Sequence, residues 1–169
     1  DEMEINDATL GTGDSAPSWT TSGKIGNALD FDGSNDYAEV TDTTSSPLDL
    51  DNAGTISLWT KIDSFGVSKG LINKSSAGTW VGTSYGIVQR GDWAGTTLQG
   101  TIGNGSHYDY VSTNSLSTDT WYHIVFTWDG NHLRMYQDGK LVDTETQDYT
   151  PTVDNDPLRI GCWNIGKTI

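Results

Sequence analysis

The sequence of 169 residues has a single cysteine, four prolines and only nine basic residues. Because Cys162 is alone, an intrachain disulfide is excluded, and a chain of this length has to be stabilised by its packed core. No apolar run is long enough to span a membrane, so membrane insertion is not expected. The 23 acidic residues give a net charge of −14, which argues against nucleic acids and anionic membranes as partners because both would be repelled.

Helical periodicity is also nearly absent, and apolar residues alternate with polar ones at a period of two. Within residues 54–63, Ile56, Leu58 and Ile62 fall on one face and Trp59 on the other. Residues 121–129 alternate in the same way. A strand with one apolar face is half buried, as in a sandwich of two antiparallel sheets. The pattern therefore predicts an all-β protein.

Turn-forming residues separate these strands, in a chain with 20 glycines. Asp129-Gly130 and Asp138-Gly139 each lie between two apolar runs. The Asp-Gly pair is a strong hairpin signal because both turn positions favour positive φ. Residues 26–40 are similarly interpreted as a pair of strands joined by a turn. Residues 1–22 are irregular and polar, and they are interpreted as a lead-in strand plus a loop.

Six segments, in order along nearly the whole chain, resemble the signature segments of laminin G-like domains, which are concanavalin A-like jelly rolls of extracellular proteins. They are GKIGNALDFDG (23–33), DYAEV (36–40), TISLW (55–59), WYHIVFTWDG (121–130), LRMYQDG (133–139) and PLRIG (157–161). The resemblance implies one domain over residues 1–169, an antiparallel two-sheet jelly-roll sandwich, and an extracellular or cell-surface location. The family normally has a further closing strand after residues 166–169. The favoured interpretation is that the chain is truncated before this strand, and the alternative is that another copy or a partner supplies it at an unfilled sheet edge.

The resemblance also implies a structural calcium ion, which many relatives hold near an F-D-G-x-x-D-Y turn. On this basis Asp32 and Asp36 are the expected ligands, with Asn35 beside them. Calcium takes six to eight oxygen ligands at about 2.4 Å, so backbone carbonyls and water would have to complete the set. The alternative is an Asx-type turn closed by its own aspartates.

Aromatic side chains in polar segments suggest a binding site for sugars, whose rings stack on aromatic faces. The candidate ligand-binding residues are Trp80, Arg90, Asp92, Trp93, Asn104, Tyr108 and Tyr110. The alternation HYDY (107–110) places the two tyrosines on one face of a strand, as a binding platform requires. The alternative for each aromatic residue is a place in the core. A core position is favoured for Trp59, Trp121 and Trp128.

Catalysis is not expected. Glycoside hydrolases of this jelly roll carry their two carboxylates on one strand as E-x-D-x-x-E, and the sequence has no such string. We therefore predict a non-catalytic extracellular module that recognises a carbohydrate or a cell-surface ligand within an adhesin or secreted protein. The alternative is a structural, self-associating subunit of an extracellular assembly, and a glycoside hydrolase or lyase is a less favoured third interpretation.

Overall fold

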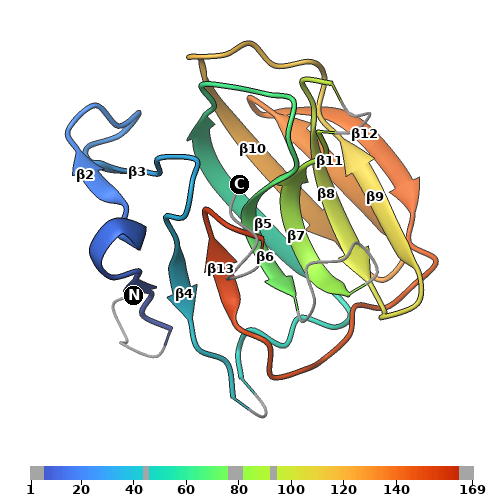
Figure 1. The fold of residues 1–169 in the computed structure, drawn as a ribbon. Coiled ribbons are helices and arrows are strands. Elements are labelled where there is room, and N and C mark those ends of the chain that lie inside the picture. The colour runs from blue at the N-terminus through green and yellow to red at the C-terminus, as the bar shows by residue number, and fades with distance from the viewer. Residues whose placement is uncertain (1–5, 44–45, 76–81, 92–94, 164–169) are drawn as a thin grey trace.

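The computed structural model describes residues 6–43, 46–75, 82–91 and 95–163, and these form a sandwich of antiparallel sheets (Figure 1). The helical structure of these residues is one 3₁₀ turn at Gly13–Ser15. No helix in the described ranges is long and apolar enough to cross a membrane. The predicted all-β jelly-roll sandwich is confirmed.

Two sheets face each other, and a short two-stranded sheet lies beside them (Figure 1). The seven-stranded sheet has the order β1 (Thr9–Leu10), β4 (Ala38–Val40), β13 (Leu158–Ile160), β6 (Lys69–Ser75), β7 (Thr83–Gln89), β8 (Leu98–Gly103) and β9 (Tyr108–Ser112). The four-stranded sheet has the order β12 (Lys140–Thr146), β11 (His132–Gln137), β10 (Trp121–Trp128) and β5 (Gly54–Lys61). The small sheet pairs β2 (Ser18–Thr20) with β3 (Ala28–Asp30).

The core lies between the two large sheets, where the period-two alternation of the sequence places its apolar side chains. Ile124, Phe126 and Trp128 of β10 are buried against residues such as Ile87 of β7 and Leu98 of β8. At position 100 of β8, a Cβ atom would overlap the ring of Phe126, so glycine is needed for this close approach.

The two Asp-Gly pairs close their turns differently. Asp138 and Gly139 have φ of 51° and 78°, as expected for the two-residue hairpin between β11 and β12. In the connection between β10 and β11, the expectation of two positive φ angles is wrong, because only Gly130 has one, at 84°. There the Asp129 carboxylate closes the turn by accepting hydrogen bonds from the N–H groups of Asn131 (2.9 Å) and His132 (2.8 Å).

The N-terminal part is more regular than the sequence suggested. The stretch interpreted as one lead-in strand plus a loop contains two strands, since β1 pairs with β4 and β2 pairs with β3. The interpretation of residues 26–40 as one strand pair is wrong, since β3 and β4 belong to different sheets. A loop closed by the side chains of Asp32 and Asp36 separates them, and it redirects the chain instead of forming a hairpin.

Candidate functional site

Two tyrosines of β9 form an aromatic pair on the face of the seven-stranded sheet that points away from the core. Val111 of the same strand belongs to the core, so the alternation turns Tyr108 and Tyr110 to the opposite face. Their ring centroids are 6.1 Å apart with an interplanar angle of 28°. The Tyr110 side chain is 37% exposed, whereas Tyr108 is half buried. An offset pair of this kind presents one ring to solvent and supports it with the other.

Arg90, directly after β7, anchors this pair. Its Nη1 donates a hydrogen bond of 3.0 Å to the phenol oxygen of Tyr108, and its guanidinium carbon lies 6.0 Å from the centroid of that ring. The arginine is largely buried, so its charge is held against the sheet. We call Arg90, Tyr108 and Tyr110 the tyrosine face. It combines an exposed aromatic ring with polar atoms of fixed orientation.

Of the other predicted ligand-binding residues, Asn104 lies in the described part of the chain, and its side chain accepts hydrogen bonds within its own turn. Asn104 lies in the turn between β8 and β9, and its Oδ1 accepts hydrogen bonds from the N–H groups of Ser106 (3.0 Å) and His107 (2.8 Å). Asn104 therefore shapes the turn that precedes Tyr108. Trp80, Asp92 and Trp93 lie outside the described residues.

The connection between β12 and β13 supports the same turn from the other side. The Asp109 carboxylate accepts hydrogen bonds from the N–H groups of Asp148 (2.8 Å) and Tyr149 (3.1 Å). The ring of Tyr149 stacks on His107 at a centroid distance of 4.8 Å, and the Thr152 N–H donates to the Gly103 carbonyl at 2.9 Å. These contacts fix the end of β9 that carries the tyrosine face.

The residues expected to bind calcium form a self-closed loop. Asp32 Oδ1 accepts hydrogen bonds from the N–H groups of Ser34 (2.8 Å) and Asn35 (3.2 Å), and Asp36 Oδ2 accepts one from the Asp32 N–H (2.9 Å). The Ser34 N–H is the main reason that the pKa of Asp32 is lowered. These bonds match the Asx-turn alternative and use one oxygen of each carboxylate. Calcium binding at this loop stays a prediction.

Trp59 is the residue that the sequence interpretation misplaced most clearly. Expected in the core, it is 39% exposed on the outer face of the four-stranded sheet. Its ring stacks on His123 at 5.1 Å, and the Lys24 ammonium lies 5.1 Å from its centroid. Trp121 is only half buried, beneath Lys61, whereas Trp128 is a core residue as expected. The period-two alternation had already assigned Trp59 to the outward face.

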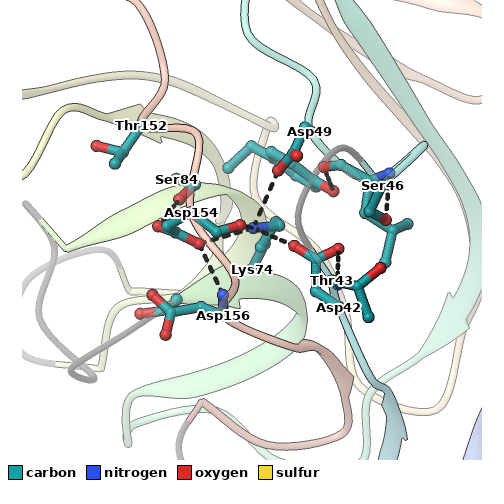
Figure 2. Close-up of polar contacts among 12 residues, drawn as sticks. Asp42, Thr43, Ser46, Asp49, Lys74, Ser84, Thr152, Asp154 and Asp156 are labelled. Carbon is teal, nitrogen blue, oxygen red and sulfur yellow. Dashed lines mark hydrogen bonds and ion pairs between the residues drawn. The ribbon is translucent and has the colours of Figure 1, made fainter.

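A second polar cluster is buried at one end of the sandwich (Figure 2). The Lys74 ammonium forms ion pairs with Asp42 and Asp154 at 2.8 and 2.7 Å and lies 3.6 Å from Asp49. Burial opposes the charge on Lys74, but the bonds to Asp154 and Asp42 outweigh this effect and raise its pKa. A lysine that keeps its proton is not a nucleophile, so this cluster has no catalytic chemistry of that kind.

Comparisons with known proteins agree with this architecture. Residues 32–168 match the family model described as the concanavalin A-like lectin/glucanases superfamily. No curated protein sequence shows significant similarity to the chain.

Solved structures of low sequence identity share the fold. The receptor-binding domain of botulinum neurotoxin mosaic serotype C/D has a TM-score of 0.68 at 17% identity, over 95% of this chain and 39% of that one. Domain 4 of AbnA, an extracellular arabinanase from Geobacillus stearothermophilus solved with arabinotriose, has a TM-score of 0.65 at 18% identity. The match covers 90% of this chain and 72% of that one. Mouse laminin α1 domains LG4-5 have a TM-score of 0.56 at 13% identity, and the match covers 77% of this chain and 32% of that one. The chain thus spans about two fifths of the neurotoxin fragment.

Proposed function

The chain belongs to the concanavalin A-like lectin/glucanase superfamily, and from this premise we propose that it is a non-catalytic module that binds carbohydrate through the tyrosine face. The observation that carries the proposal is the exposed ring of Tyr110, supported by Tyr108, which is itself hydrogen-bonded to Arg90. The apolar face of a sugar ring packs on such an aromatic ring, and its hydroxyls pair with nearby polar atoms. The arabinotriose bound to domain 4 of the arabinanase supports a sugar-binding role for this fold.

The acidic residue between the two tyrosines of β9 suits a binding module better than an enzyme. Asp109 lies between the two tyrosines in sequence, on the opposite side of β9, and its carboxylate accepts two backbone hydrogen bonds. Glu39 is paired with Arg159 at 2.9 Å. A glycoside hydrolase instead needs one carboxyl group that gives up a proton and a second that attacks or activates water. The proposed module therefore holds its ligand without cleaving it.

The proposal includes a location outside the cell or on its surface, and a calcium ion at the loop of Asp32, Asn35 and Asp36. Calcium that binds only the folded state raises the melting temperature (Tm), by an amount that grows with its concentration. We expect a higher Tm in calcium than in chelator for the wild-type chain, and a smaller difference for a variant with Asp32→Asn and Asp36→Asn. Equal values in calcium and chelator for both chains would remove calcium from the proposal.

The experiment that tests the binding role is a glycan array probed with wild-type protein and three variants. Tyr110→Ala removes the exposed ring, and Tyr110→Phe keeps the ring but removes its hydroxyl. Tyr136→Ala is the matched control, because Tyr136 is a half-buried tyrosine of β11 in the other sheet. We expect Tyr110→Ala to bind at least tenfold more weakly, and Tyr110→Phe and the control to keep most of the affinity. Wild-type affinity in Tyr110→Ala would remove the tyrosine face from the proposal.

Self-association is the alternative that the same protein sample can test. β1 lies at one edge of the seven-stranded sheet and is paired there with β4. Exposed strand edges favour association between copies. We expect light scattering after size exclusion to give the mass of one chain. A concentration-independent oligomer would favour a structural subunit over a monomeric binding module.

A further inference from the structure

The Lys74 ammonium lies among oxygen atoms of three aspartates, which we call the cage (Figure 2). Its Nζ is 2.5 Å from the carbonyl oxygen of Asp154 and 2.7 Å from the carboxylate of the same residue. The carboxylates of Asp42 and Asp49 lie at 2.8 and 3.6 Å. The side chain of Lys74 is 1% exposed, and that of Asp42 is completely buried. The ammonium is thus surrounded by protein oxygens in place of water.

The cage joins segments that are distant in the sequence. Asp42 and Asp49 belong to the connection between β4 and β5, Asp154 belongs to the connection between β12 and β13, and Lys74 is on β6. Figure 2 shows the ammonium between these two connections. A single cation therefore ties two loops to the seven-stranded sheet at this end of the sandwich.

Bonds that do not involve the lysine help to hold the carboxylates. Asp154 Oδ2 accepts a hydrogen bond from the Ser84 hydroxyl at 3.0 Å, and its Oδ1 accepts one from the Asp156 N–H at 2.9 Å. Asp42 Oδ1 accepts one from the Thr43 N–H at 2.8 Å. These supports keep the oxygens directed towards the centre of the cage, as ligands around a metal ion are kept in place by their own hydrogen bonds.

The cage contains more negative than positive charge. Three carboxylates face one ammonium, and a fourth, Asp156, is close enough that its pKa is raised, first by burial and then by the charge of Asp154. A cation with two positive charges would balance these groups better than an ammonium does. Carboxylate and carbonyl oxygens are also the ligands that calcium prefers, at 2.3–2.6 Å.

We infer that the Lys74 ammonium takes the place of a metal ion in this cage, and that its removal converts the cage into a calcium site. The wild-type chain then needs no metal at this end. As they stand, the described residues form no group of three or more acidic, histidine or cysteine side chains suited to a metal ion. Once the lysine is removed, three of the cage oxygens need to move by only a few tenths of an ångström, and Asp49 by about 1 Å, while water fills the vacated volume.

The test compares Lys74→Ala with the parent chain, both carrying Asp32→Asn and Asp36→Asn so that the other predicted calcium loop is removed. We expect calcium to raise the Tm of the Lys74→Ala chain by about 5 °C or more, magnesium to raise it less because it demands tighter octahedral geometry, and choline chloride at equal ionic strength to leave it unchanged. The parent chain should respond to none of these salts. An equal response of both chains to calcium, or none in Lys74→Ala, would overturn the inference.

Terbium luminescence gives a second readout that is local to the cage. The Tyr85 hydroxyl donates to the Leu48 carbonyl at 2.8 Å close to Asp49, and its ring stacks on Trp128 at 5.4 Å, so both rings can sensitise an ion in the cage. We expect emission from Lys74→Ala and its loss when Asp42→Asn is added. If Lys74→Ala does not fold in chelator, refolding is compared with and without calcium. Recovery in calcium alone supports the inference, and no recovery in either contradicts it.

Discussion

The lysine cage and the tyrosine face both place a cationic side chain against fixed polar groups, but they differ in their access to solvent. Lys74 is 1% exposed and its ammonium is surrounded by protein oxygens, whereas Tyr110 in the tyrosine face is 37% exposed. Buried ion pairs between two loops and β6 tie those loops to the sheet, whereas an exposed aromatic ring beside fixed donors suits recognition. The comparison agrees with a stabilising role for the cage and with the binding role that we propose for β9.

The largest effect on stability is expected for a variant that breaks the cage. Lys74→Ala leaves buried carboxylates without their cation, and removal of one partner from a buried ion pair costs about 3–5 kcal/mol of unfolding free energy. Ligand affinity should change less than about threefold, well under 1.4 kcal/mol, because separate contacts of Asp109 and Tyr149 hold the end of β9. Urea unfolding and calorimetric titration measure the two quantities.

Lys69→Ala is the matched control, since the Lys69 ammonium donates to the Ser64 hydroxyl at 3.2 Å in an exposed setting. It should unfold at nearly the wild-type urea concentration. If Lys74→Ala were no less stable than this control, the cage would not have the stabilising role assigned to it.

A second prediction concerns the coupling within the tyrosine face. Tyr108→Phe removes the phenol oxygen that accepts from Arg90, and Arg90→Lys removes the guanidinium geometry that reaches it. If this bond positions the pair, the double variant loses less affinity than the sum of the single variants, with a coupling of about 1 kcal/mol. Strict additivity in the double-mutant cycle would show that the bond does not contribute to binding.

A third prediction separates two neighbouring aspartates of the cage. Burial raises the pKa of Asp154, but the hydrogen bonds from Lys74, the Asp156 N–H and Ser84 together outweigh burial, so the pKa is lowered. The pKa of Asp156 is raised, first by burial and then by the charge of Asp154. Asp154 therefore stabilises the fold above its unfolded pKa, near 3.8, and this contribution is lost as the pH falls through the lower folded value. Asp156 has a raised pKa in the folded chain, so its ionised carboxylate lowers the free energy of unfolding at neutral pH.

We expect Asp154→Asn to lower the unfolding free energy at neutral pH by about 1–3 kcal/mol, and Asp156→Asn to raise it by a few tenths of a kcal/mol or more. Both differences should shrink in acid, where the wild-type carboxyls are protonated. Urea titrations at a series of pH values test the signs. Destabilisation by both variants at neutral pH would contradict the assignment for Asp156.

The last prediction concerns Cys162, which is buried and belongs to neither region. Burial raises the pKa of its thiol, so little thiolate is present at neutral pH. We expect a thiol reagent to modify the native chain at least about 100-fold more slowly than the unfolded chain, because the thiolate is the reactive form. Rapid modification, or a disulfide-linked dimer, would instead favour the self-associating alternative.

The strands and the tyrosine pair could be predicted from sequence because both depend on local periodicity. The alternation in residues 121–129 and in HYDY fixes which side chains share a face. Trp59 was misplaced because its hydrophobicity was given more weight than the same alternation. The cage could not be predicted, because Lys74 and Asp154 are 80 residues apart and meet only through the pairing of β6 with β13.

The most direct test of the binding role is to map the ligand on the molecule by NMR. The best glycan from the array is titrated into isotope-labelled protein, and perturbed amide and aromatic signals are assigned. We expect the strongest changes at Arg90, Tyr108 and Tyr110, with little change around Lys74. Strong changes confined to Trp59 and His123 on the opposite sheet would contradict it.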